Sequence, residues 1–429
     1  MVRDIIKMSK KELNRIEVIH KVLDKRIKQK AAAELLNLCI RQVGRIVKRV
    51  NEQGDASIVH GNRGKESNRK LSEKFKENVL KTVKKKYPDF GPTFAAEKLE
   101  EIDKKKVSKE TLRHWMIEEH IWTPRKLKDK GKVHLWRERK ECFGEMVLSD
   151  GSIHDWLEGR GPKMVLMAYI DDATGKPFGR FYPAEDATAA MDSFKGYIKK
   201  YGIPESIYFD RNSIYKTTRA PNLDEELKGE RPKTQFEKVL AILDVKPIHA
   251  YSAPAKGRIE RLFKTFQDRL IKEMRLADIR SMDDANKFLL TYLPKYISRF
   301  SVPAKNPKTL HRKISEKLDL NWVFAFRDER TISNDFSVRW NNRFFLLTNP
   351  SLSLKKGRIL VVENLKGQIR ICYKDRILDF KEITESTLEH IRKTIKLMKI
   401  TAKKSKSKKP YKPAENHPWR TQNSALFSR

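Results

Sequence analysis

Three acidic residues in the middle of the chain are the first candidates for chemistry. Asp150 follows a predicted strand at 145–149, Asp210 follows another at 204–209, and Glu260 lies in the first turn of a predicted long helix. If the two strands are neighbours in a sheet, both aspartates reach the same edge and the helix lies beside them. Clustered carboxylates repel unless a cation joins them, and such oxygen ligands suit Mg²⁺ or Mn²⁺. Two such ions could activate a nucleophile and stabilise a leaving oxygen in phosphoryl displacement.

Taken singly, each acid has a simpler interpretation. The chain has 56 acidic residues, and aspartate is common where a strand turns. Asp171 and Asp172 fit a hairpin turn after the second strand, and Asp155 and Asp186 fit ordinary turns. The prediction of a site therefore depends on the set of three acids and on the elements that carry them.

Those elements predict an α/β layer in the central region. Strands are expected at 145–149, 163–170, 177–182, 204–209 and 246–250, with helices at 187–200, 235–243 and 256–274. Three strands in a meander followed by alternating helix and strand are typical of one sheet covered by helices.

A helical unit at the start of the chain predicts DNA recognition. Within a helical unit at 10–53, apolar residues recur at helical spacing from Leu13 to Leu23, and further helices are expected at 30–38 and 39–50 with a short turn at 37–39, which is the spacing of a helix-turn-helix. On the third helix, Val43, Ile46, Val47 and Val50 form the inward face. Arginine and glutamine at the start of such a helix suit base edges, and later cations suit phosphates. The outward residues are Arg41, Gln42, Arg45, Lys48 and Arg49. The alternative is an ordinary three-helix bundle with a solvated basic face.

The charge of the chain also favours a polyanionic partner. Lysine and arginine number 93 against 56 acids, giving a net charge of +37. Cations that neutralise phosphates release counterions, which drives binding to double-stranded DNA. No apolar run is long enough to span a membrane, and no signal peptide is expected at the start. The three cysteines lack metal-binding spacing, which favours a reducing compartment.

Several strings in the sequence carry a family resemblance. They are residues 147–156 (VLSDGSIHDW), 208–215 (YFDRNSIY), 256–270 (KGRIERLFKTFQDRL) and 415–420 (ENHPWR). They resemble the ISNCY-type bacterial insertion-sequence transposases, within the superfamily of DDE transposases and retroviral integrases. The resemblance extends over nearly the whole chain. It departs from the family pattern at Arg211–Asn212, where members usually have a Lys-His pair.

The resemblance implies a DNA transposase with an RNase H-like core. Asp150, Asp210 and Glu260 would be the metal-binding DDE triad, with two Mg²⁺ or Mn²⁺ ions. The enzyme would bind the terminal repeats of its element, cleave with activated water and join 3′-hydroxyl ends to target DNA. It would act as a homo-oligomer on paired DNA ends, in the bacterial cytoplasm at the nucleoid, with no membrane partner.

The helix that carries Glu260 supplies further DNA-contact candidates. Lys256 and Arg258 lie at its start, where free N–H groups and cations attract phosphate. Lys264 lies one turn after Glu260 and could contact the DNA end. The alternative for Lys264 is a surface ion pair with Glu260.

The sequence thus predicts a multidomain protein with N-terminal helix-turn-helix units, a central α/β RNase H-like core, a small C-terminal β-barrel and a basic tail. The expected segments are a helix-turn-helix domain at 1–54, a linker at 55–70, a second helical DNA-binding domain at 71–122, a basic arm at 123–142, the catalytic core at 143–300, a helical linker at 301–334, the barrel at 335–381, and a helix with a basic tail at 382–429.

Two other functions remain open on the sequence. A non-catalytic helix-turn-helix regulator would share the basic N-terminal unit, and a nuclease of the same core fold would cut DNA without joining it. An assay that resolves cleaved from joined DNA separates the three.

Overall fold

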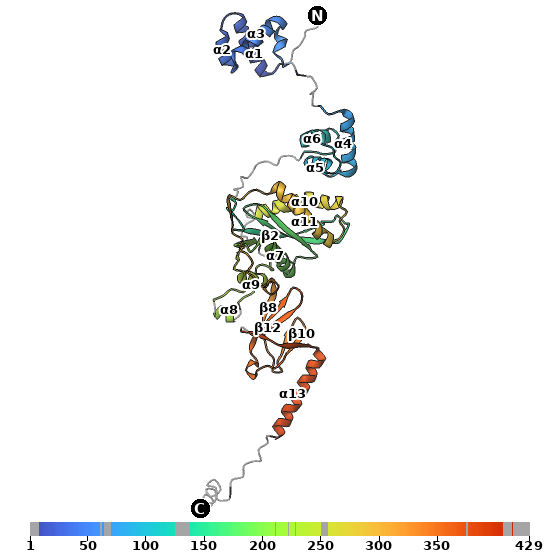
Figure 1. The fold of residues 1–429 in the computed structure, drawn as a ribbon, viewed down its shortest axis with the longest axis vertical. Coiled ribbons are helices and arrows are strands. Elements are labelled where there is room, and N and C mark those ends of the chain that lie inside the picture. Colours follow the sequence, from blue (N-terminus) through green and yellow to red (C-terminus); the bar gives the residue numbers. More distant parts are fainter. Residues whose placement is uncertain are drawn as a thin grey trace, which may run out of the picture. The chain divides into compact units, whose positions relative to one another are not determined.

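The chain divides into two compact units, Met1–Asp129 and Lys130–Arg429 (Figure 1). The computed structural model describes residues 8–60, 62–63, 70–124, 137–210, 212–221, 223–227, 229–249, 256–374, 376–405 and 414. Within these ranges, no helix combines the length and the apolar character that a membrane span requires.

The first three helices form the predicted helix-turn-helix. They are α1 (Lys10–Leu23), α2 (Gln29–Leu36) and α3 (Ile40–Gln53). Asn37 ends α2 in the left-handed region, with φ 54°, which asparagine tolerates and which turns the chain toward α3. Gly44 lets the two helices approach, because a Cβ there would lie 3.3 Å from the Gln29 side-chain oxygen.

The predicted linker begins later than residue 55. A short 3₁₀ helix, η1 (Asp55–Ile58), continues from α3, and Ile58 is buried in the same core as Val43 and Val50. The assignment of residues 55–58 to the linker is therefore wrong, because the apolar Ile58 side chain packs back onto the helical unit.

A second group of three helices follows, as expected. They are α4 (Glu73–Lys86), α5 (Pro92–Glu101) and α6 (Lys109–Glu118). Serine side chains cap two of them: Ser72 accepts from the Phe75 N–H at 3.3 Å, and Ser108 accepts from the Thr111 N–H at 3.0 Å. The core between the helices includes Val79, Tyr87, Phe90, Phe94, Leu112 and Met116.

The second unit contains a five-stranded sheet with the order β4-β3-β2-β5-β6. The strands β2 (Val147–His154), β3 (Met164–Asp171) and β4 (Pro177–Tyr182) form an antiparallel meander. The strands β5 (Ser206–Phe209) and β6 (Lys246–His249) run parallel to β2. This mixed sheet has the RNase H-like topology that the resemblance implies.

Helices cover both faces of that sheet. Alternate residues of β2 and β3 point to opposite faces, as pleating requires. Leu148 and Leu166 pack with α10 (Gly257–Leu276) and α11 (Met282–Phe300). Val147 and Val165 pack with α7 (Ala187–Tyr201) and α9 (Gln235–Ile242). A short helix, α8 (Leu223–Leu227), lies between β5 and α9, in a segment whose described residues form no other helix or strand.

The predicted helical linker at 301–334 is mostly extended. It contains β7 (Asn306–Thr309), which pairs with β1 (Cys142–Phe143), a four-residue helix α12 (Leu320–Val323), and the strand β8 (Ala325–Thr331). The prediction of helix is wrong here. Pro303 and Pro307 lack N–H donors, and Phe324 is fully buried in the core beneath α7, which holds the chain against the sheet domain.

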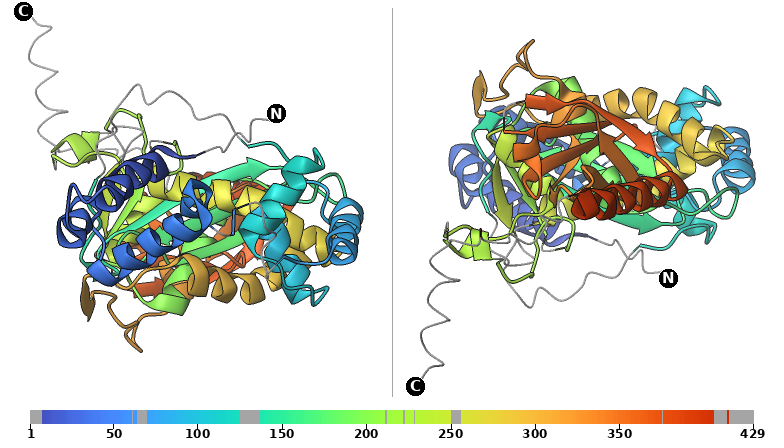
Figure 2. Two further views of the ribbon diagram at one scale, coloured as in Figure 1. Left: turned by 90° about the horizontal axis from the view of Figure 1, so that it is seen from above. Right: turned by 90° about the horizontal axis from the view of Figure 1, so that it is seen from below.

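The C-terminal strands form two sheets and not the closed barrel that was predicted. One sheet has the order β14-β10-β9, the other β13-β12-β11-β8, and both contribute to one core. Figure 2 shows these strands in orange and red. Without a ladder that closes the ring, the barrel prediction is wrong. The remaining bounds are β9 (Ser337–Trp340), β10 (Arg343–Leu347), η3 (Leu352–Leu354), β11 (Arg358–Asn364), β12 (Ile369–Tyr373), β13 (Arg376–Leu378) and β14 (Phe380–Ile383).

The last helix lies where the sequence predicts a helix followed by a basic tail. α13 spans Glu385–Ser405 within the expected segment 382–429. Leu388 at its start is buried. The rest of the predicted tail, including the string at 415–420, lies outside the described residues, as do residues 125–136 of the predicted basic arm.

Candidate catalytic site

Asp150 lies inside a strand and not at its end. β3 pairs with β2 along its whole length, from Val147 opposite Asp171 to His154 opposite Met164. That hairpin prolongs β2 beyond the point where the sequence predicts a turn, so the predicted strand end is wrong.

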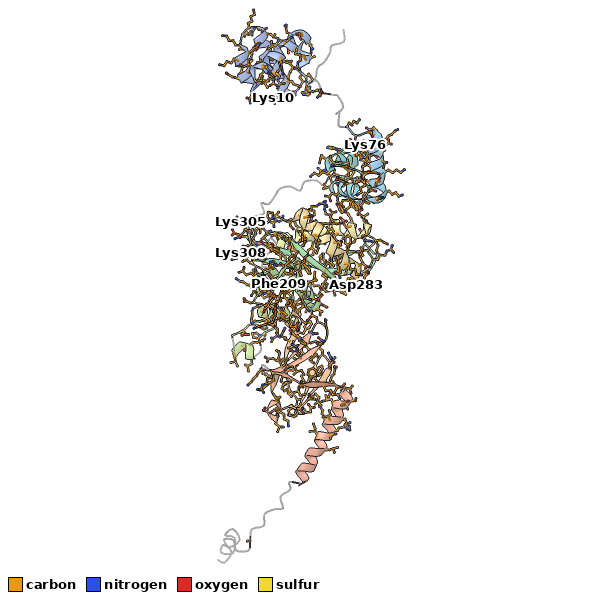
Figure 3. The ribbon with its side chains drawn as sticks, viewed as in Figure 1. Lys10, Lys76, Phe209, Asp283, Lys305 and Lys308 are labelled. Carbon is orange, nitrogen blue, oxygen red and sulfur yellow. The ribbon has the colours of Figure 1, made fainter. Side chains whose placement is uncertain are left out.

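The neighbouring parallel strand explains why the site still forms at this level. β5 pairs with β2 only at Ile207 and Tyr208, opposite Val147 and Leu148, and it ends at Phe209. Asp210 follows directly, so continuing the same register places it level with Asp150. Phe209 is labelled in Figure 3. Asp150 is thus fixed by a ladder on one side, and Asp210 begins a loop on the other.

One cation joins the two aspartates. The Lys256 Nζ lies 3.2 Å from Asp150 Oδ1 and 3.5 Å from Asp210 Oδ2. Burial raises the pKa of Asp150, the Lys256 charge opposes this shift, and the charge of Asp210 adds to it. The two carboxylates therefore face a common point at which a positive charge is stabilised.

Glu260 occupies the helix stripe that faces β2. Lys256, just before α10, reaches Asp150, and Gln267 donates from its Nε2 to Ser152 Oγ at 3.3 Å. Glu260 lies four residues after Lys256 and seven residues before Gln267. Residues at these spacings share one side of a helix, so Glu260 lies on the same side as Lys256 and Gln267. Its side chain is exposed.

The structure brings two of the three predicted acids together. Among the described residues, no three acidic, histidine or cysteine side chains are close enough to hold one metal ion. Asp150 and Asp210 converge on Lys256, and Glu260 lies one turn along the helix. The donor chemistry of the converging pair, two carboxylates around a positive charge, nevertheless fits a hard divalent cation.

A fourth acid, Glu185, was not predicted. It lies between β4 and α7, and Gly151 leaves room for it: a Cβ at Gly151 would stand 2.5 Å from Glu185 Oε2. Burial raises the pKa of Glu185, and the charges of Asp150 and Asp210 raise it further. The following Asp186 caps α7, accepting from the Ala189 N–H at 2.7 Å, as its turn assignment predicts. An acid between a strand and a helix cap was the only signal in the sequence.

Arg258 is held inside the protein. Its Nη1 lies 2.6 Å from Asp172 Oδ1, and its side chain is only 14% exposed. The sequence predicts that Arg258 contacts DNA, but in the structure its guanidinium is already paired with Asp172. Asp172, assigned only to a hairpin turn, is fully buried and also binds Arg137. Its neighbour Asp171 fits the turn, accepting from the Thr174 N–H at 2.8 Å.

Lys264 has the opposite environment. It is exposed on α10, and the part of the chain that the structure describes contains no ion pair between Lys264 and Glu260. The surface pair weighed as its alternative role is thus not formed. Lys264 is available to a ligand that approaches this side of the helix.

The candidate DNA interface is the outer face of α3. All five predicted contact residues are exposed, and Val43 and Val50 beneath them are buried. Glu52, 3.8 Å from the Lys48 Nζ, is the acid paired with this face. The exposed residues are Arg41, Gln42, Arg45, Lys48 and Arg49.

The corresponding helix of the second helical group differs. Glu110 of α6 pairs with Arg113 at 3.5 Å, and Glu118 pairs with Lys76 of α4 at 2.8 Å. Lys76 is labelled in Figure 3. Acids thus offset the cations around α6, whereas α3 presents nearly uncompensated positive charge. This contrast favours α3 as the helix that meets a phosphate backbone.

Comparisons with known proteins cover both units. A family model described as a helix-turn-helix domain matches residues 14–66. A transposase of Sinorhizobium fredii, y4bF, is 38% identical over 345 residues, which cover 80% of this chain and 74% of the relative. The transposase for insertion sequence IS1202 of Streptococcus pneumoniae is 25% identical over 437 residues, covering 92% of this chain and 90% of that protein.

Solved structures with similarity to the chain include integrase cores. The HTLV-2 integrase catalytic core domain in complex with magnesium has a TM-score of 0.26 and 16% identity, covering 35% of this chain and 85% of that one. The catalytic core domain of BIV integrase has a TM-score of 0.28 and 16% identity, covering 38% and 91%.

Proposed function

Because the chain belongs to the bacterial insertion-sequence transposases, in the superfamily of DDE transposases and retroviral integrases, we propose that it cleaves DNA at the ends of its mobile element and joins the freed 3′-hydroxyl ends to target DNA. The observation that carries this proposal is the pair Asp150 and Asp210, whose carboxylates face one positive charge where two neighbouring strands meet. Phosphoryl displacement needs positioning and neutralised charge more than a protein nucleophile.

Asp150 and Asp210 would hold Mg²⁺ or Mn²⁺, with Glu260 as the third ligand and two ions in the complete site. A bound divalent metal supplies activation of the attacking hydroxyl and neutralisation of charge on the leaving oxygen. Asp150 gives the rigid position, since β2 and β3 fix its backbone. Glu260 is exposed and four residues after Lys256, so its side chain can turn toward the same point.

The basic residues around this point would act on the substrate. Lys256 faces the point where Asp150 and Asp210 would hold a metal, so its ammonium would be placed to contact a DNA phosphate bound there. Lys264, exposed on the same helix, would contact the DNA end. Arg258, buried against Asp172, would act by holding the helix rather than by touching DNA.

DNA recognition is assigned to α3. Arg41, Gln42 and Arg45 would read base edges of the terminal repeat in a major groove, and Lys48 and Arg49 would contact the backbone. The exposure of all five side chains supports this assignment. The protein would act on paired ends as a homo-oligomer, at the nucleoid in the cytoplasm.

The test is an assay with the full chain, duplexes that carry the element's own ends, a target duplex and Mg²⁺. Denaturing gels resolve cleaved ends from joined products. We expect both, and neither with Asp150→Asn, which should still bind the ends. Binding without cleavage would identify a regulator, and cleavage without joining would identify a nuclease.

A further inference from the structure

Asp172, at the turn after β3, is a completely buried carboxylate with three donors. It accepts from Arg258 Nη1 at 2.6 Å, from the backbone N–H of Lys140 at 2.8 Å, and from the Arg137 guanidinium. A carboxylate away from water is tolerated only when its charge and its lone pairs are satisfied. The positions of these three donors are therefore tied to Asp172 and through it to each other.

The donors come from two elements that are distant in the sequence. Arg258 lies in the first turn of α10, two residues after Lys256 and two before Glu260. Arg137 and Lys140 belong to the segment 137–140, the end of the basic arm that joins the two units of the chain. Here we call this segment the arm anchor.

Further contacts lock the arm anchor to the same place. Arg258 Nη2 donates to the backbone oxygen of Arg137 at 2.8 Å, so one guanidinium holds both Asp172 and the anchor. Arg139 Nη1 donates to the backbone oxygen of Ala173 at 3.2 Å. Removing the anchor would leave the Asp172 carboxylate with one of its three donors and Arg258 with one of these two acceptors. The first turn of α10 and the arm anchor therefore form one joint.

We propose that Asp172 is a positioning residue for catalysis: it sets the rotation and height of the first turn of α10, and so places Lys256 and Glu260 relative to Asp150, only while the arm anchor is seated. This inference rests on the proposed function, because Glu260 must be a ligand for its placement to matter. The arm anchor belongs to the chain segment that connects the N-terminal helical unit to the unit with the catalytic site. Through Asp172 and Arg258, the positions of Lys256 and Glu260 therefore depend on that connecting segment.

The test uses Asp172→Asn in the full chain, compared with Asp192→Asn. Asp192 on α7 also forms an ion pair, with Arg180 at 3.5 Å, and accepts a hydrogen bond from the Tyr182 hydroxyl at 2.8 Å, but it lies on the other face of the sheet. Single-turnover cleavage of element ends gives a maximal rate and a half-saturating DNA concentration. Misplacement of a ligand by about 1 Å can cost about 100-fold in rate. We expect Asp172→Asn to lower the maximal rate by roughly that factor, with half-saturation changed less than about twofold.

Hydrogen exchange gives a readout that does not depend on activity. We expect faster exchange in Asp172→Asn confined to the arm anchor and the start of α10, beginning with the Lys140 amide. A general loss of stability would instead accelerate exchange across the sheet and raise half-saturation. That outcome, or a wild-type rate in Asp172→Asn, would overturn the proposal.

A second variant covers the case in which Asp172→Asn does not fold. Arg258→Lys keeps the charge but cannot hold Asp172 and the Arg137 backbone together. We expect a smaller fall in rate, again with unchanged half-saturation; a raised half-saturation with a normal rate would mean that Arg258 contacts DNA. Asp150→Asn is run in parallel. If it still cleaves, the proposed function has failed; if it is inactive while both joint variants cleave normally, only the inference has failed.

Discussion

Replacing Lys256 with glutamine removes the positive charge between Asp150 and Asp210 and leaves two carboxylates facing each other. The lysine side chain is 15% exposed and the aspartates are 23% and 42% exposed, so the site is only partly screened by water. Two charges at 4 Å interact by about 4 kcal/mol at an effective dielectric constant of 20, before desolvation is subtracted. After that correction we expect Lys256→Gln to lower the free energy of unfolding by about 1–2 kcal/mol in the absence of metal.

Thermal unfolding with EDTA and with MgCl₂ measures this effect. A loss of that size corresponds to roughly 2–8 °C in Tm for a unit of this size. Mg²⁺ should then stabilise Lys256→Gln more than the wild type, because in the variant the metal does not compete with the lysine ammonium for the two aspartates. At a Mg²⁺ concentration of 100 times its Kd, binding adds about 2.7 kcal/mol to the free energy of unfolding. Lys264→Gln, an exposed lysine of the same helix, is the matched control.

The pH dependence has a definite sign. Burial raises the pKa of Asp150, and loss of the Lys256 charge should raise it further. Since protonated Asp150 no longer repels Asp210, the difference between variant and wild type should be present at neutral pH and shrink as the pH falls through the pKa of Asp150. A variant that is as stable as the wild type in EDTA and gains no more from Mg²⁺ would refute the reasoning.

Further tests address the other parts of the chain. Asp150→Asn should abolish cleavage and joining in the gel assay but leave end binding intact or slightly stronger, since a negative charge near phosphate is removed; wild-type activity would contradict its role. Arg45→Ala should cost about 1–3 kcal/mol on the element's end and much less on random duplex in titrations, whereas Lys48→Ala should weaken both alike; an equal loss with Arg45→Ala would move base reading to α6. Deleting residues 406–429 should lower the slope of log affinity against log salt by roughly 0.9 for each phosphate that the tail neutralises in the intact protein. An unchanged slope would mean that the tail contacts no DNA phosphate. Burial lowers the pKa of His311 to about 4, so its neutral form contributes stability above the usual histidine pKa, and unfolding should become easier as the pH falls from about 6.5 to 4; His311→Asn should remove that step from the pH profile.

Local patterns predicted the elements better than they predicted the contacts between them. The apolar spacing around Val43 and Val50 identified α3 and its exposed basic face, because helix periodicity is a property of neighbouring residues. The length of β2 was missed because Gly151 and Ser152 look like turn residues, while the ladder with β3 that keeps them extended is set by residues 164–171. The same limit applies to the barrel, since closure of a sheet depends on pairing between distant strands.

The site shows the same division. Asp150 and Asp210 could be paired from the expectation that their strands are neighbours, although β2 continues past Asp150 to His154 and only β5 ends at this level. Glu185 and Asp172 could not be recognised. Their importance comes from the missing side chain at Gly151 and from Arg137 and Arg258, which only the folded chain brings together.

The first turn of α10 is also where the chain least tolerates a change in length. Lys256 points to Asp150, Arg258 to Asp172, and Ile259 into the core beneath the sheet. Each added residue turns a helix by about 100°, so one insertion between Lys256 and Ile259 would break at least one of these three contacts. In the segment between β5 and α9, by contrast, the Leu223 and Leu227 side chains of α8 are exposed, so an added residue at α8 would displace neither of them from the core. Frame-preserving insertions and deletions should therefore be tolerated at α8 and selected against at the start of α10.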